Sequence, residues 1–381
     1  MPVPTSRERV LAALNHRQPD RTPIFEYVLL SPVASQILGR DFADYGGDQH
    51  GWMQLAAEHG FDVTLRQYAV DRVELAQVLG HDMIYCVPNP TEKMVETIAH
   101  LEQARLGSPG ILREEQLLPE DPVERLILRN QDNQSALILE PSAKDAAQNP
   151  YAIYDLLRAE MARRDLDLPI YAPAFYHGIW TDVDLMQTML LAPDVAHEHF
   201  QLMTALALRH IKQLLLLDID LIGIGGDFAG NRPIISPDAY HTFIMPELAK
   251  LSAAIHTGGK HACNASDGNL WPVIDDFLTG CGVDAYGEID FGAGMDLRTL
   301  KNQFGAQITL IGNMDCGKVL SFSTPDEIAR LSIECLEAGW GDGGHLFTAS
   351  NAITASVPLK HYLAMVNAYR TFFDLPLLSL D

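Results

Sequence analysis

The sequence predicts an α/β protein, a (β/α)8 barrel of the TIM type that forms a single domain over residues 1–381, with a helical extension at its N-terminus. Short β-rich runs alternate with longer stretches of helical periodicity, which is typical of βα units and a parallel sheet. Several runs end in polar or small residues, as the active face at the carboxyl ends of barrel strands requires. Eight strand candidates are found, at residues 23–28, 81–87, 169–175, 221–227, 260–265, 284–289, 308–313 and 345–350.

The first element is a helix that begins at a capping box, in which Thr5 supplies the N-cap oxygen and Glu8 can reach back. Its apolar stripe extends to Leu14, and the segment around Pro19 ends it before the first strand candidate. Further helical patterns lie at residues 196–216, 236–256, 269–279, 296–303, 325–338 and 358–372.

Two β-rich runs, at residues 62–67 and 135–139, stand outside this alternation. They could form an additional hairpin or belong to an excursion between residues 90 and 165. Because the count of eight strands leaves these runs out, a doubly wound open sheet remains an alternative to the closed barrel.

The composition excludes several classes of partner and location. A formal net charge of −23 repels phosphate backbones and anionic lipid, so neither nucleic acid nor a membrane is an expected partner. No run of about 18 uncharged apolar residues is present, and the N-terminus lacks the apolar stretch of a signal peptide. The five cysteines are not spaced as a disulfide framework. These observations predict a cytoplasmic protein whose thiols are free to bind metal or to react.

Three residues are candidate ligands of a zinc ion. His261 and Cys263 are two positions apart in a predicted strand, so their side chains share one face of it. An imidazole and a thiolate on one face make half of a tetrahedral zinc site. Cys316 follows the predicted strand at 308–313 and could supply a third ligand, which leaves the fourth position for a substrate. Simple packing of this histidine and these cysteines is the alternative.

Carboxylates at strand ends are the catalytic candidates. Asp227 closes the strand at 221–227, and Glu288 lies near the end of the strand at 284–289. Either could position a substrate or move a proton, and Glu288 could also be a displaceable metal ligand. The alternatives are that Asp227 caps the following loop and that Glu288 is an ordinary carboxylate with its hydrogen bonds satisfied. Tyr176, His177 and Asn351 follow other strands and are predicted to line the substrate pocket.

Five blocks of sequence resemble the uroporphyrinogen decarboxylase superfamily, and they follow its order along nearly the whole chain. They are residues 6–15 (SRERVLAALN), 19–24 (PDRTPI), 235–240 (ISPDAY), 312–316 (GNMDC) and 343–353 (GGHLFTASNAI). The resemblance implies a TIM barrel. The chain lacks the arginine-rich segment and the catalytic aspartate of the porphyrinogen decarboxylases, where it has residues 26–31 (EYVLLS) and 84–88 (IYCVP).

The resemblance is closer to the zinc- and corrinoid-dependent methyltransferases, which carry the same H-x-C motif. It implies a Zn²⁺ cofactor and methyl transfer between a small substrate and a corrinoid (a methylcobalamin-type carrier) on a partner protein. In thiol-methylating members the last cysteine lies by the eighth strand, where this chain has Ser350 and Asn351. A methoxylated aromatic compound is therefore one candidate substrate. A decarboxylase of a small acid and a non-enzymatic corrinoid-binding protein are alternatives. The apolar tail at residues 372–380 is either a contact in a homo-oligomer or a cover for the bottom of the barrel.

Overall fold

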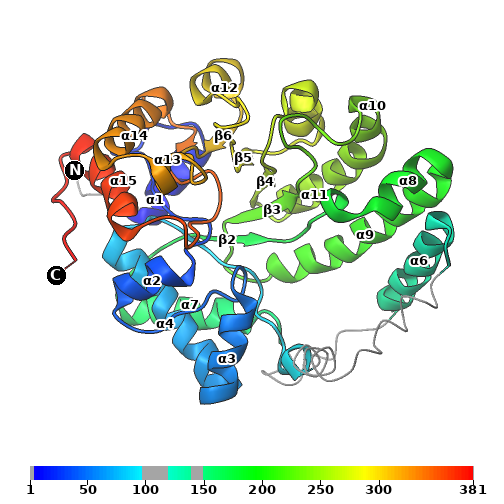
Figure 1. Cartoon of the computed structure of the whole chain (residues 1–381), viewed down its shortest axis with the longest axis horizontal. Coiled ribbons are helices and arrows are strands. Elements are labelled where there is room, and N and C mark those ends of the chain that lie inside the picture. The colour runs from blue at the N-terminus through cyan, green and yellow to red at the C-terminus, as the bar shows by residue number, and fades with distance from the viewer. Residues whose placement is uncertain (1–3, 97–118, 139–148, 381) are drawn as a thin grey trace.

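In the computed structural model, residues 4–96, 119–138 and 149–380 are described. Seven parallel strands form one curled sheet in which each strand pairs with the next along the chain. They are β1 (Ile84–Tyr85), β2 (Ile170–Pro173), β3 (Leu221–Gly225), β4 (His261–Ala265), β5 (Ala285–Gly287), β6 (Thr309–Ile311) and β7 (His345–Leu346). Figure 1 shows these strands at the centre of the molecule, with helices around them. The predicted α/β class is confirmed, and the sequential strand order differs from that of a doubly wound sheet, which reverses direction.

Residues 23–28, the first predicted strand, form one isolated bridge, at Ile24, instead of a regular strand. Ile24 is bridged in parallel to Phe347, immediately after β7. On its other side, the carbonyl of Ile24 accepts a hydrogen bond of 2.7 Å from the backbone of Asp82, just before β1. This segment therefore contacts both edges of the seven-stranded sheet.

Helices precede, connect and follow the strands. They are α1 (Ser6–Leu14), α2 (Ser31–Leu38), α3 (Gln49–His59), α4 (Phe61–Leu79), α6 (Pro122–Ile138), α7 (Ala152–Arg163), α8 (Val183–Leu191), α9 (Pro193–Leu214), α10 (Pro237–Ala239), α11 (Met245–Thr257), α12 (Leu297–Phe304), α13 (Val319–Phe322), α14 (Pro325–Gly339) and α15 (Leu359–Phe372). Between α10 and α11 the chain makes a π-helical turn, and the helix predicted at 269–279 is a short 3-10 turn followed by a π-helical turn. The hairpin considered at 62–67 and 135–139 is wrong, because residues 62–67 belong to α4 and residues 135–138 to α6; residue 139 lies outside the described part.

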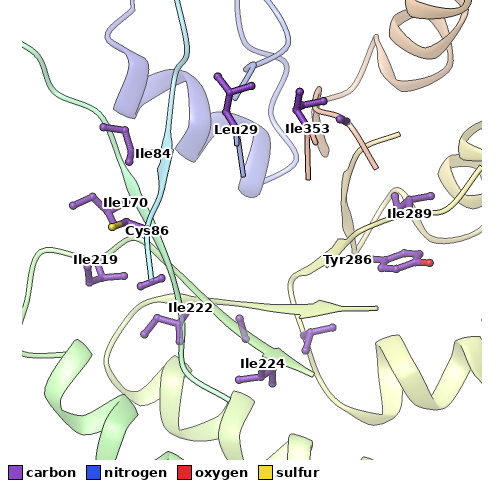
Figure 2. Close-up of a cluster of buried hydrophobic side chains, with 14 of the residues drawn as sticks. Leu29, Ile84, Cys86, Ile170, Ile219, Ile222, Ile224, Tyr286, Ile289 and Ile353 are labelled. Atoms are coloured by element: carbon purple, nitrogen blue, oxygen red, sulfur yellow. The ribbon is translucent and has the colours of Figure 1, made fainter. Parts of the chain in front are cut away.

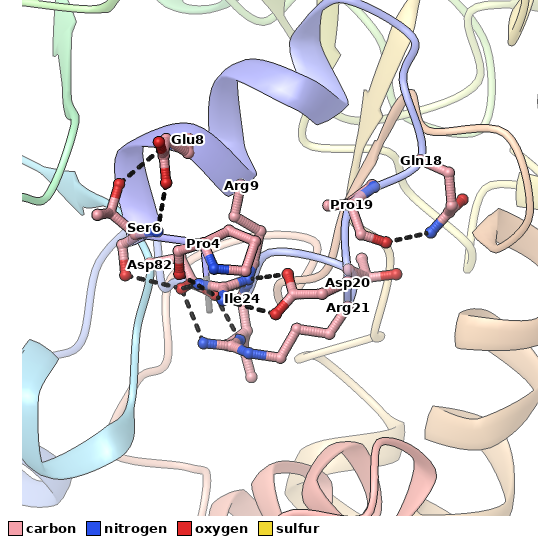
Figure 3. Close-up of polar contacts among 12 residues, drawn as sticks. Pro4, Ser6, Glu8, Arg9, Gln18, Pro19, Asp20, Arg21, Ile24 and Asp82 are labelled. Atoms are coloured by element: carbon pink, nitrogen blue, oxygen red, sulfur yellow. Dashed lines mark hydrogen bonds and ion pairs between the residues drawn. The ribbon is translucent and has the colours of Figure 1, made fainter. Parts of the chain in front are cut away.

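Helix α1 begins as predicted and lies at the amino ends of the strands. Both hydrogen bonds of its capping box form, between Thr5 and Glu8. The carbonyl of Ala13, near the end of the helix, accepts a hydrogen bond from Gly344, immediately before β7. Around the start of α1, the buried carboxylate of Asp82 receives hydrogen bonds from several donors (Figure 3).

The two faces of the sheet carry separate sets of buried side chains. The outer face packs against the helices through aliphatic residues such as Ile170, Ile222 and Ile224 (Figure 2). The inner face forms a second cluster together with α1 and the segment at 23–28. Its members are Val10, Ala13, Leu14, Phe25, Val28, Met83, Tyr85, Tyr171, Leu221, Cys263, Ala285, Ile311 and Leu346. This alternation follows from the two-residue period of strands. It decides which side chains can reach, from the inner face, the open end of the sheet at the carboxyl ends of the strands, which we call the mouth.

The C-terminal tail is held against its own chain. The backbone amide of Leu378 donates to the side chain of Asn367 at 2.7 Å, and Phe372 and Phe373 pack against the hydrophobic core. In the described ranges, no helix has both the length and the apolar character needed to span a membrane.

Candidate active site

A cavity of about 330 Å3 opens at the carboxyl ends of the strands. Aromatic rings make up most of its lining, and no Lys or Arg is among the described residues that line it. These residues are Tyr27, Tyr85, Tyr171, Pro173, Ala174, Phe175, Tyr176, Gly223 and Ile224. Its position at the carboxyl edge is where barrel enzymes hold their substrates.

Tyr171 projects from the inner face of β2 across two neighbouring strands. A Cβ atom at Gly223 of β3 would lie 3.0 Å from the Tyr171 ring, and one at Gly287 of β5 would lie 3.3 Å from the Cys263 sulfur. The two glycines therefore leave the room that this ring and this thiol occupy. The Tyr171 hydroxyl hydrogen-bonds the Cys263 thiol, yet burial dominates and raises the pKa of Cys263 to about 12.

Tyr27, Tyr85 and Tyr171 contact one another beneath the cavity. The rings of Tyr27 and Tyr85 have centroids 4.1 Å apart, and those of Tyr85 and Tyr171 are 5.0 Å apart, edge to face. The Tyr85 hydroxyl donates to the Tyr27 hydroxyl at 3.2 Å. None of these three tyrosines was among the predicted site residues, although each lies inside a predicted strand, at residues 23–28, 81–87 and 169–175.

The carboxylates of Asp227, Asp267 and Glu288 gather at the same edge, after β3, β4 and β5, and Asp290 lies near Asp267. Asp227 and Glu288 are predicted site residues, and Asp267 was not predicted. The backbone amide of Asp267 donates to Asp227 at 3.3 Å. Burial raises the pKa of all three: Glu288 reaches about 8 and Asp267 about 6, and in both cases negative charge on the neighbouring carboxylates adds to the shift. A hydrogen bond from Tyr27 partly offsets the shift of Glu288.

Glu288 also has an unusual backbone conformation, with a φ of 64°. Side chains other than glycine adopt this left-handed region rarely, and residues that do so are concentrated at functional sites. The carboxylate interacts electrostatically with Tyr27, Tyr85, Tyr171 and Tyr176, so it lies close to the cavity.

The predicted pocket residues Tyr176 and His177 differ in exposure. The Tyr176 side chain is 53% exposed and lines the cavity. The His177 ring is buried, its Nδ1 accepts a hydrogen bond of 3.4 Å from the amide of Ile179, and burial lowers its pKa to about 3. The uncharged His177 therefore supports the loop and the Tyr176 ring, with which it stacks at a centroid distance of 5.9 Å. The side chain of Asn351 donates to Asp267 at 3.5 Å.

The structure does not bring the three predicted zinc ligands together. His261 is the first residue of β4, so it lies at the amino end of the strand, away from the mouth. Cys263 is fully buried on the inner face, two residues further along. Cys316 follows β6 at the mouth, where its sulfur lies 3.7 Å from the Ser350 hydroxyl. Across the described ranges, no three His, Cys, Asp or Glu side chains are placed to hold a metal ion. As they stand, these side chains do not fit the predicted zinc site.

Other cavities are lined mainly by residues of helices and their flanking loops. One of about 350 Å3 lies among residues of α3, α4 and the loop at 40–43, and one of about 220 Å3 lies beside α12 and α14 and is also lined by Asn313, Met314 and Asp315, which follow β6. None of the eight predicted site residues lines either of them. The mouth cavity is therefore the candidate active site.

Comparisons with known proteins identify relatives. Residues 181–372 match the model of the family described as uroporphyrinogen decarboxylase (URO-D). The chain is 24% identical over 185 residues to the uroporphyrinogen decarboxylase of Coxiella burnetii (strain RSA 493 / Nine Mile phase I), covering 47% of this chain and 48% of that protein. It is 26% identical over 185 residues to the enzyme of the same name from Xylella fastidiosa (strain Temecula1 / ATCC 700964), covering 46% and 50%. Each match thus spans about half the length of the curated relative.

A solved structure is similar over nearly the whole chain. It is a methyltransferase from Methanosarcina mazei, with a TM-score of 0.67, 16% identity, and coverage of 97% of this chain and 99% of that one. At this identity the similarity shows a shared fold.

Proposed function

The chain belongs to the uroporphyrinogen decarboxylase (URO-D) family, and we propose that within this family it is a methyltransferase. The proposed reaction moves a methyl group between a small substrate in the mouth cavity and a corrinoid carried by a separate protein. One observation carries the proposal: the described lining is aromatic, has no Lys or Arg and lies beside three carboxylates. A porphyrinogen with several carboxylates would be repelled there. The fold shared with a methyltransferase supports the same assignment.

The reaction requires positioning and control of charge. The bond between the methyl carbon and a heteroatom of the substrate breaks, the heteroatom keeps the electron pair, and the methyl carbon is bonded to the cobalt of the partner's reduced corrinoid. Tyr176 and the tyrosines beneath it would position the substrate and exclude water. Asp227 and Glu288 would stabilise or move charge, and a Glu288 pKa of about 8 lets this side chain hold a proton near neutral pH.

Zinc at His261, Cys263 and Cys316 stays a prediction from the sequence. Because these side chains are not assembled as ligands, no step of the proposed reaction is assigned to a metal.

We also infer that residues 23–29 complete the sheet as the eighth strand position of a closed barrel, because Ile24 connects β7 to the start of β1.

Methyl transfer to free cob(I)alamin tests the proposal, since it can replace the unidentified corrinoid protein. The purified chain would be mixed with cob(I)alamin and, one at a time, methoxylated aromatics, methyl thioethers and methylated amines. The expected result is methylcobalamin, seen by its absorbance, in equal amount to the demethylated product. Glu288→Gln should slow its formation at least tenfold. Glu58→Gln, at an exposed position of α3, should not.

Two other outcomes would replace the proposal. Release of CO2 from small carboxylic acids, without methylcobalamin, would identify a decarboxylase. Recovery of every compound unchanged would favour a corrinoid-binding protein without turnover.

A further inference from the structure

The carboxylates of Asp227, Asp267 and Glu288 lack a cationic partner in the part of the chain that is described. Among the described residues, no Lys, Arg or His contributes to the electrostatic environment of any of the three. By contrast, the buried carboxylate of Asp82 is paired with Arg9 and Arg21. Partly buried negative charges that repel one another are costly without a counter-charge, so this edge of the sheet favours a positive ligand.

The lining of the cavity supports the same conclusion independently. The faces of tyrosine rings are electron-rich and attract cations, and rings grouped around a pocket are a known means of recognising quaternary ammonium groups. Tyr27, Tyr85 and Tyr171 form such a group at the base of the cavity, and Tyr176 lies at its exposed rim. A cavity of about 330 Å3 is large enough for a small organic ligand.

From the unpaired carboxylates and the aromatic lining, we propose that the mouth cavity binds a methylated ammonium cation as its substrate. The role of this cation as a substrate rests on the proposed function, whereas its binding does not. When such a cation gives up a methyl group, the carbon–nitrogen bond breaks and nitrogen keeps the electron pair. The leaving group is a neutral amine that needs no proton. This differs from a methyl ether, whose departing oxygen must be protonated or held by a Lewis acid.

Two ligands of the same shape, one charged and one neutral, show whether binding depends on positive charge or only on burial of apolar surface. Choline carries a trimethylammonium group, and 3,3-dimethylbutan-1-ol replaces its nitrogen with carbon and has no charge. Titration calorimetry at pH 8 on the intact chain should show choline binding at least tenfold more tightly than the neutral alcohol. Equal affinities, or no binding of choline at millimolar concentration, would overturn the proposal.

Variants locate the site. Glu288→Gln should weaken choline binding at least tenfold and leave binding of the alcohol unchanged, whereas Glu58→Gln should alter neither. Tyr176→Leu should weaken choline binding several-fold, and Tyr176→Phe should restore it, because the ring face is kept. Since Tyr176 is largely exposed, this pair should not affect folding. Choline affinity that none of these variants changes would place the cation elsewhere and refute the site.

The cation-binding proposal and the proposed methyl transfer can each be refuted without refuting the other. Choline binding without methyl transfer from any donor would refute the proposed function and leave the cation site standing. Methyl transfer from neutral methoxy compounds by a chain that does not bind choline would support the proposed function and refute the cation site.

Discussion

The Tyr85 hydroxyl donates a hydrogen bond to the Tyr27 hydroxyl at 3.2 Å, while their rings lie with centroids 4.1 Å apart. Tyr85→Phe removes the donor and keeps the ring face. We therefore expect choline affinity within about twofold of the natural chain, together with a loss of about 1 kcal/mol in the free energy of unfolding. Tyr27→Leu removes a ring face and should weaken choline binding more, which calorimetry would show. If Tyr85→Phe weakens binding as much as Tyr27→Leu, hydroxyl groups and not ring faces hold the ligand.

Glu26 should make stability depend on pH. Its side chain is buried, and one carboxylate oxygen accepts hydrogen bonds from the Thr348 hydroxyl at 3.1 Å and from the amide of Ala349 at 3.4 Å, while Tyr362 also hydrogen-bonds the carboxylate. Burial raises its pKa to about 8, so the folded chain binds this proton more tightly than the unfolded chain. The resulting stability is complete below the ordinary pKa of 4.5 and is lost as pH rises through about 8.

Glu26→Gln keeps the shape of the protonated, neutral carboxyl group and removes the group that titrates. The variant's advantage over the natural chain should grow by about 3 kcal/mol between pH 6 and pH 9, as urea denaturation at each pH would show. Glu288 titrates in both proteins, so its effect cancels in the difference. A difference that stays constant with pH would mean that Glu26 is ionised in the folded chain at neutral pH.

The cysteines should differ in reactivity. Cys316 is the partly exposed one, whereas the other four are buried. Burial raises the pKa of all five thiols, and the values reach about 11 for Cys86 and about 12 for Cys263, Cys281 and Cys335, so exposure is what distinguishes Cys316. A thiol reagent such as DTNB should therefore modify one thiol rapidly in the native chain, and none in Cys316→Ser. Five thiols should react after denaturation.

The same measurement tests the predicted zinc site. If Cys316 stays unreactive until a chelator is added, and the purified chain carries one zinc per molecule, the three ligands come together in solution. Free reactivity of Cys316 without bound zinc would leave His261 and Cys263 as packed side chains of β4.

Buried strands were the most predictable part of the fold. Seven of the eight candidates contain an observed strand, because strands covered on both faces read as continuous apolar runs. The run at 62–67 belongs to a helix: Leu65 shares the buried face of α4 with Phe61 and Tyr68, four and three positions away, whereas Val63 is exposed. Period and length, not β propensity, separate the two cases.

The site was predictable wherever a polar residue follows a strand. That rule placed Asp227, Glu288 and Tyr176 near the mouth, and applied once more it would have found Asp267, two residues after β4. The two-residue spacing of His261 and Cys263 indicates a shared face but not a height along the strand. Because β4 begins at His261, that imidazole lies at the opposite end from Cys316. Sequence spacing cannot reveal such a separation.

Asp82 should be among the most sensitive positions for stability. Its fully buried carboxylate accepts hydrogen bonds from Arg9 at 2.7 Å, from Arg21 at 2.6 Å and from the amide of Ile24 at 3.1 Å (Figure 3). Asp82→Asn leaves two arginines without their shared counter-charge, and we expect a loss of about 3–5 kcal/mol in the free energy of unfolding, measured by urea denaturation. Asp20→Asn is the matched control, because Asp20 also pairs with Arg9 but its side chain is 36% exposed. The control should cost about 1 kcal/mol or less, since solvent reaches the Asp20 carboxylate and Arg9 keeps Asp82 as its partner. Equal losses in the two variants would show that burial of the Asp82 charge does not determine the strength of this contact between α1 and the start of β1.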